Sequence, residues 1–168
     1  MIFSIYNIYV LYTFGIPKNL SNTYYMLESR RYNFGIVYPI LITIILILIF
    51  YIWLHIHSEL DTEYTHIGKW LIYLTMVALS IVVAITRYQK TVVRYKTHYV
   101  AAICSSVTSV GWMLLFAQHF LYVAISMFIL VGIASIITQT FRSCILYWLE
   151  LVNIYSLFIV LFVLSLTL

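Results

Sequence analysis

The sequence predicts an all-α fold, a polytopic integral membrane helical bundle with five transmembrane helices and an N-terminal interfacial helix. Two observations of composition support this fold class. Of the 168 residues, 64% are hydrophobic and 8% are charged, and the mean hydropathy is +1.03. A soluble domain carries about 25% charged residues. Only a bilayer offers enough apolar surroundings for this composition, and several charge-free stretches are long enough to cross it as helices.

Residues 1–33 form the predicted N-terminal segment. As a helix, the apolar residues 1–16 reach about 22 Å, which is short of a hydrocarbon core of about 30 Å. Their tyrosines favour the membrane interface, so we expect a helix lying there, with a sixth span as the alternative. No basic residues precede this stretch and no small-residue cleavage site follows it, so we do not expect a cleaved signal. A short amphipathic helix is expected over residues 19–31.

The rest of the chain, residues 34–168, is the predicted five-helix bundle. Its first span has no charge and ends near tryptophan and histidine, which suit the membrane interface. An acidic loop, a basic loop and two short connections separate the later spans. The predicted spans are residues 34–56, 70–86, 99–117, 120–138 and 146–167.

Lys and Arg residues gather on one side of this arrangement. Five spans place the N-terminal segment, residues 87–98 and Arg142 on one side, where eight of the nine Lys and Arg residues lie. Residues 57–69 and the C-terminus lie on the other side, with only Lys69. Because these cations stay in the cytoplasm, the first side is predicted to be cytoplasmic and the second external. Because most of the charges lie in short loops beside apolar stretches, we interpret the net charge of +4 as setting the membrane topology and contacting anionic lipid. It does not indicate binding to nucleic acid.

Small residues predict where helices pack. Ala101, Ser105 and Ser109 recur at every fourth position of the third span, and Gly132 is a weaker counterpart in the fourth. In lipid, no hydrophobic effect drives helices together, so they associate through close packing of their backbones, which small residues allow. We therefore expect these four residues at contacts between helices.

Glu150 is the one acid within or against a predicted span. A charge at that depth costs a few kcal/mol, which makes the residue a functional candidate. Residues 151–168 reach about 27 Å and nearly cross the bilayer alone, so a buried and an interfacial placement of Glu150 both stay open. His98 starts the third span on the same side. We expect a His98–Glu150 pair that holds two helix ends together, rather than a proton-transfer pair.

Four candidate metal ligands lie at the end of the first predicted span and in the external loop that follows it, namely His55, His57, Glu59 and Asp61. Imidazoles and carboxylates bind divalent ions, but this spacing matches no accepted ligand pattern, and a solvated acidic loop explains it equally well. The two cysteines, Cys104 and Cys144, lack the spacing of a zinc or redox site. No metal and no cofactor are therefore expected.

Residues 17–25 read PKNLSNTYY, a proline followed by a polar stretch that ends in Thr-Tyr-Tyr. This motif resembles one that precedes the first span in a group of small, uncharacterised multi-span membrane proteins of gut bacteria and their phages. The likeness continues with HYVAA from His98, with Trp112 and with WLE ending at Glu150, whereas Asn19 and Asn22 replace an expected serine and alanine. The resemblance implies a shared architecture and names no reaction.

The same resemblance points to six polar residues, Ser21, Thr23, Tyr24, Tyr25, His98 and Glu150. All six lie on the predicted cytoplasmic side. Because Glu150 needs a compensating partner at this depth, we expect residues 21–25 to fold against His98 and Glu150 and to form one polar cluster.

The sequence shows no nucleophile with a base, no phosphate-binding glycine loop and no charged relay along a span. We therefore predict a non-catalytic interaction or accessory membrane protein and not an enzyme. Its expected partners are the lipid bilayer and other membrane proteins or further copies of the chain, without nucleic acid. The alternative is a small-molecule or ion carrier that uses the polar cluster, which requires a cavity reaching Glu150. A membrane enzyme and a lysis protein are the remaining alternatives.

Overall fold

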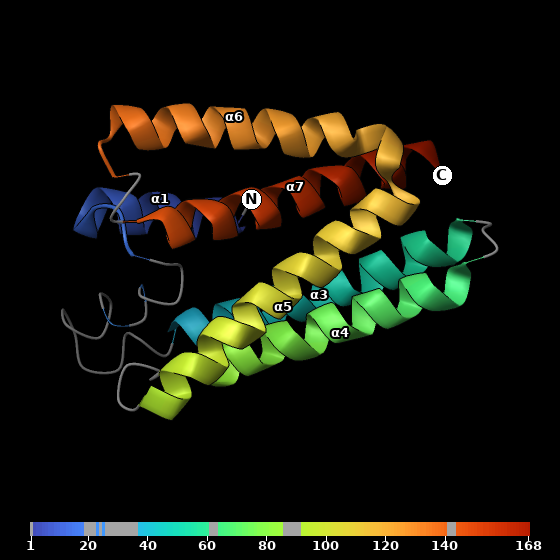
Figure 1. The fold of residues 1–168 in the computed structure, drawn as a ribbon, viewed down its shortest axis with the longest axis horizontal. Coiled ribbons are helices and arrows are strands. Elements are labelled where there is room, and N and C mark those ends of the chain that lie inside the picture. Colours follow the sequence, from blue (N-terminus) through green and yellow to red (C-terminus); the bar gives the residue numbers. More distant parts are fainter. Residues whose placement is uncertain are drawn as a thin grey trace.

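The computed structural model of the chain describes residues 2–18, 37–60, 64–85, 92–140 and 144–168, together with Thr23 and Tyr25. These residues form α-helices and one short 3-10 helix, with no strand among them (Figure 1). The elements are α1 (Ile2–Phe14), α3 (Val37–Glu59), α4 (Thr65–Ala84), α5 (Val92–Phe116), η3 (Gln118–Phe120), α6 (Leu121–Ile137) and α7 (Ile145–Thr167). The predicted all-α fold is confirmed for this part of the chain.

Four of these helices are long and apolar enough to cross a membrane. The qualifying segments are Pro39–Glu59, Thr65–Ala84, Lys96–Phe116 and Tyr147–Thr167. α6 has 17 residues and reaches about 25 Å, which is shorter than the hydrocarbon core of about 30 Å. By length and composition the chain is thus compatible with a multi-pass membrane protein, and the predicted fifth span is not confirmed.

Two helices begin earlier than the spans predicted for them. α4 begins at Thr65 and α5 at Val92, whereas the predicted spans begin at residues 70 and 99. Hydropathy marks only the apolar part of a helix, while the backbone hydrogen bonds continue through polar residues beyond it. Part of each predicted loop is therefore helical.

The helices form two antiparallel hairpins that α5 connects (Figure 1). α3 packs against α4, α6 packs against α7, and α5 packs along α4 before it approaches α7. α1 lies antiparallel to the first half of α7. The Tyr155 hydroxyl donates to Ser4 Oγ at 3.2 Å, and the Cys144 thiol donates to the Ile16 carbonyl at 3.7 Å. α1 is thus packed into the bundle, and a helix lying in the plane of the interface is not confirmed.

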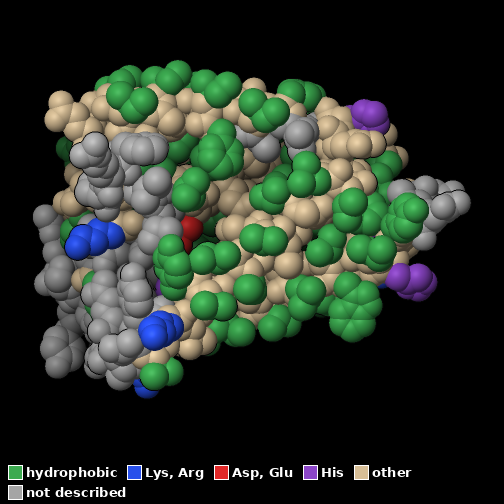
Figure 2. Space-filling view, in the orientation of Figure 1, with side chains coloured by type: hydrophobic (Ala, Val, Ile, Leu, Met, Phe, Trp, Pro, Cys, Tyr) green, Lys and Arg blue, Asp and Glu red, His purple; other side chains and the backbone are tan. Residues whose placement is uncertain are grey.

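The two ends of the bundle differ in charge, and we name each after one residue. The Lys96 end holds the starts of α5 and α7, and the His57 end holds the connection from α3 to α4. Figure 2 shows basic side chains at the Lys96 end and histidines at the His57 end. Of the described cations, Lys18 and Arg94 lie at the Lys96 end with Lys96, and Lys69 lies near the start of α4. The described residues thus keep the charge asymmetry that the sequence indicates.

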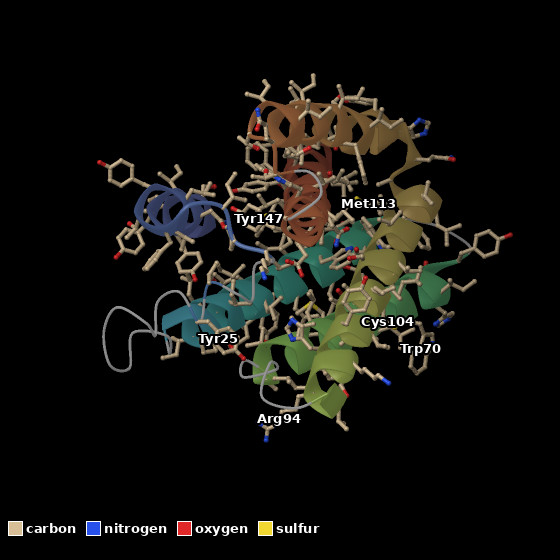
Figure 3. All side chains as sticks on the ribbon, turned by 60° about the vertical axis from the view of Figure 1, so that its left-hand side comes forward. Tyr25, Trp70, Arg94, Cys104, Met113 and Tyr147 are labelled. Atoms are coloured by element: carbon tan, nitrogen blue, oxygen red, sulfur yellow. The ribbon has the colours of Figure 1, made fainter. Side chains whose placement is uncertain are left out.

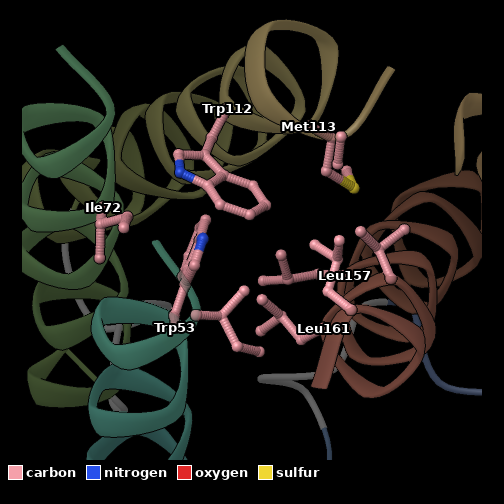
Figure 4. Close-up of a cluster of buried hydrophobic side chains, with 10 residues drawn as sticks. Trp53, Ile72, Trp112, Met113, Leu157 and Leu161 are labelled. Atoms are coloured by element: carbon pink, nitrogen blue, oxygen red, sulfur yellow. The ribbon is translucent and has the colours of Figure 1, made fainter. Parts of the chain in front are cut away.

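The main buried core lies toward the His57 end. It contains side chains from α3, α4, α5 and α7, including Trp53, Ile72, Trp112 and Leu157 (Figure 4). The rings of Trp53 and Trp112 are 0% exposed and meet edge to face, with centroids 5.3 Å apart. Such a pair adds about 0.5–1.5 kcal/mol beyond the burial of its area. This core fixes four helices relative to one another.

A second packed region joins α1 to α3 and α7 near the Lys96 end. Tyr6 and Val10 of α1 are buried, with Leu41 and Ile42 of α3 packed against them. The backbone N–H of Tyr147 donates to the Lys18 carbonyl at 3.2 Å, which attaches the end of this N-terminal segment to α7. The predicted N-terminal segment and the predicted bundle therefore share buried side chains.

Candidate functional site

Glu150 lies in the first turn of Tyr147–Thr167, a segment long and apolar enough to cross a membrane, and lines two cavities. The central cavity, of about 90 Å³, lies among α3, α4, α5 and α7. The side cavity, of about 250 Å³, lies among α5, α6 and α7. Figure 2 shows acidic atoms in a hollow beside α7. Since a water needs roughly 15 Å³ of such space, each cavity has room for several waters or a small solute.

Polar side chains from three helices reach the central cavity. They are Thr75 of α4, Ser105, Ser106 and Ser109 of α5, and Asn153 of α7. The Ser109 hydroxyl donates to Asn153 Oδ1 at 3.0 Å and joins α5 to α7. The hydroxyls of Thr75 and Thr108 lie 2.6 Å apart and join α4 to α5. Hydrogen bonds between membrane helices contribute on average about 0.6 kcal/mol each, so these contacts align the helices more than they stabilise them.

The predicted packing residues of α5 lie on its buried face. Ala101, Ser105 and Ser109 are at most 6% exposed. Ser105 and Ser109 are too small to fill the space between the helices, and both line the central cavity. Gly132 of α6 is half-buried, and a Cβ added there would meet nothing within 4 Å. Among the described residues, no close helix contact lies at Gly132.

An aromatic cluster fills the bundle beyond the central cavity. Trp53 lines the cavity, and next to it His57 packs against Trp112 and Phe116, with ring centroids 6.0 Å and 4.8 Å away. Gly68 of α4 lies directly against the imidazole, and a Cβ at this position would collide with it. The absence of a side chain at Gly68 thus makes the position of His57 possible.

The described candidate metal ligands point in different directions. His57 is 0% exposed, and its Nε2 donates to the Thr65 carbonyl at 2.9 Å. The side chain of His55 is 76% exposed, and its Nδ1 lies 4.0 Å from Glu59 Oε1. Residues two positions apart on a helix do not share a face, which separates the two imidazoles. Asp61 lies outside the described residues. Within the described ranges, no group of three His, Cys, Asp or Glu side chains could hold a metal ion.

His98 lines the side cavity together with Glu150. Its side chain is buried, and the imidazole faces the backbone carbonyls of Val82 and Ile85 at the end of α4. His98 therefore connects the start of α5 to the end of α4. The structure brings His98 and Glu150 to one cavity, and a direct pair between them stays a prediction.

Two of the predicted polar residues pack against α1. Thr23 is buried and accepts a hydrogen bond from the Tyr6 hydroxyl at 2.6 Å. Tyr25 packs against the cluster that Tyr6 and Val10 form. Ser21 and Tyr24 lie outside the described residues.

Tyr147 packs between the N-terminal segment and the start of α7. Its side chain is 0% exposed and lies between α1 and α7 (Figure 3). Leu11 and Ile16 of the N-terminal segment pack against the cluster that Tyr147 forms with Cys144 and Leu151. Tyr147 thus helps to hold the N-terminal segment against α7, and a cluster that joins residues 21–25 to Glu150 stays a prediction.

Sequence reasoning missed two residues that shape the site, Asn153 and Trp53. Asn153 lies within the predicted fifth span, and the rule that singles out polar groups in a membrane applies to it as it does to Glu150. Trp53 has no comparable signal in the sequence. Its partners come from three other helices, and a tryptophan near a span end equally suits the interface.

Comparisons of the chain with family models, with curated proteins and with solved structures find no match. The resemblance to small multi-span proteins of gut bacteria and their phages therefore stays an expectation from short motifs. The function has to be argued from the site itself.

Proposed function

We propose that this chain is a multi-pass membrane carrier that binds a small organic cation between its helices. The observation that supports the proposal is Glu150, whose side chain lines a cavity on each side of the contact between α5 and α7. The sequence alone favours an accessory protein and makes a carrier conditional on a cavity that reaches Glu150. That the chain is not an enzyme, and that it needs no cofactor, stay predictions.

The lining of the central cavity suits a cation with an apolar body. The Glu150 carboxylate would attract such a cation, because charges interact more strongly in apolar surroundings than in water. Asn153 lies beside Glu150, Trp53 lies toward the other end, and most of the remaining lining is aliphatic. An indole ring attracts an ammonium group by about 0.5–2 kcal/mol. A protonated amine or a quaternary ammonium with a small hydrocarbon body would meet each of these groups.

The two cavities provide a route for such a cation. The two cavities are separated by the gap between α5 and α7. Four residues of these helices line both cavities, namely Ala102, Ser106, Glu150 and Asn153. The hydrogen bond from Ser109 to Asn153 crosses this gap. A small separation of α5 and α7 would join the two spaces. The proposed cation therefore passes from the side cavity to the central cavity through this gap.

The membrane arrangement that goes with this function has five spans. Its fifth span is α6, which is apolar throughout and can cross where the bilayer is locally thin. α1 would enter the bilayer from the interface beside α7 without crossing it. Lys18, Arg94 and Lys96 support a cytoplasmic Lys96 end. The N-terminal segment and residues 87–98 are then cytoplasmic, and residues 57–69 and the C-terminus are external.

Binding of quaternary ammonium probes tests the proposed site. Tetramethylammonium and ethyltrimethylammonium, which are small enough for a cavity of about 90 Å³, are titrated into the purified protein in detergent, and tryptophan fluorescence is followed because Trp53 lines the cavity. We expect saturable binding that weakens at least tenfold in Glu150→Gln, since removing one charge of a desolvated pair costs about 2–5 kcal/mol. Glu59→Gln is the matched control, because the Glu59 side chain is 57% exposed at the other end.

Uptake of radiolabelled tetramethylammonium into proteoliposomes distinguishes a carrier from a binding protein. Binding with uptake supports the full proposal, while binding without uptake keeps the cation site and removes the transport function. Failure of the unmodified protein to bind either probe, or equal binding by Glu150→Gln, contradicts the site. The accessory-protein hypothesis would then be preferred.

A further inference from the structure

A groove runs along the outside of the bundle between α4 and α5. Its volume is about 560 Å³, which exceeds that of either cavity at Glu150. Lys96 and Thr97 line it at the start of α5, and Thr108 lines it farther along the same helix. Most of the lining between these residues is apolar. The groove therefore combines one charged end with a long hydrocarbon surface.

Small residues form the floor of this groove. Ala78 and Ala101 each line it and are 6% exposed, whereas Val77 and Val100 line it and are 59% and 58% exposed. The alanines leave a depression between two helices whose neighbouring side chains project outward. In a membrane, this surface faces lipid chains rather than water.

The length of the groove matches one leaflet. Twelve residues separate Lys96 from Thr108, which corresponds to about 18 Å of helix. Half of the hydrocarbon core measures about 15 Å. An acyl chain that starts at the depth of Lys96 would therefore run the length of the groove and end near the middle of the bilayer.

We propose that this groove binds one anionic phospholipid, with an acyl chain along the alanine floor and the phosphate headgroup at Lys96. Lys96 is exposed, and Figure 3 shows Arg94 two residues earlier at the same end of α5. Charge complementarity selects an anionic headgroup over a zwitterionic one. The proposal uses the outer face of α4 and α5 and is independent of the cation site at Glu150.

Native mass spectrometry tests this proposal. The protein is reconstituted in nanodiscs of equal parts phosphatidylglycerol and phosphatidylcholine, and the lipids that stay bound after release are counted. We expect one phosphatidylglycerol to be retained in preference to phosphatidylcholine. Because one lysine near a membrane surface contributes about 1 kcal/mol toward anionic lipid, Lys96→Gln should lower this preference about fivefold. Lys18→Gln, which removes an exposed cation outside the groove, should leave it unchanged.

A groove-filling variant examines the apolar part separately. Val77→Trp places a large ring over the groove from an exposed position, so the fold should persist while the bound lipid is lost. Circular dichroism confirms the helix content of each variant. Equal retention of the two lipids by the unmodified protein overturns the proposal, as does an unchanged preference in Lys96→Gln. A dimer that retains no lipid overturns it as well, because a second copy would then occupy the groove.

Discussion

The two halves of this bundle are built from the same four helices and differ in how the space between them is filled. Toward the His57 end, Trp53 and Trp112 meet in a core with no exposed area on either ring. Toward the Lys96 end, the same helices enclose the central cavity, where α5 presents Ser105 and Ser106. Side-chain size at facing positions thus decides which half is filled and which is hollow. The filled half holds the helices together, and the hollow half is left for the proposed function.

The largest expected effect is the loss of Trp112. Trp112→Ala should destabilise the protein by about 3–5 kcal/mol, because it removes a buried ring and leaves a hole among four helices. The free energy of unfolding is measured by denaturant titration in detergent micelles, with circular dichroism as readout. Leu115→Ala on the same helix is the control, since Leu115 is 60% exposed. Equal losses in both variants would mean that the filled half is not the stabilising one.

A methyl group added at Gly68 tests how tightly the filled half is packed. Gly68→Ala should cost about 1–3 kcal/mol, because the new Cβ collides with the His57 imidazole and lies 2.9 Å from Phe116 Cε2. Gly111→Ala is its matched control, as a Cβ there meets nothing within 4 Å. Thermal unfolding of the two variants side by side gives the answer. If both melt at the temperature of the unmodified protein, the close contact between α3 and α4 does not exist in solution.

The smallest effect is expected in the hollow half. Ser109→Ala removes the hydrogen bond to Asn153 and should lower the free energy of unfolding by only about 0.6 kcal/mol. The same titration in detergent measures it, and Ser165→Ala, at an exposed position of α7, is the control. A loss as large as that of Trp112→Ala would show that the polar half also holds the bundle together. The proposed contrast between the halves would then fail.

The sequence predicted the coarse fold because that information is local. The charge-free stretches, the small-residue face of α5 and the position of Glu150 in the first turn of a span all depend on neighbouring residues in the chain. The helices α4 and α5 begin before the first residues of the predicted spans for the same reason, since hydropathy detects the apolar part of a helix and not its full length. The candidate site was predicted in part, through Glu150 and His98, and without Asn153 or Trp53.

The sequence by itself determined that this chain forms apolar helices with cations concentrated on one side, because composition and charge order do not depend on how the helices meet. Only the tertiary structure decided that Glu150 lies between two cavities and that Gly68 lies against His57. In lipid, the packed face and the lipid face of a helix are both apolar, so no periodic pattern tells them apart. Which faces meet is settled by the fit of side chains across helices that lie far apart in the chain.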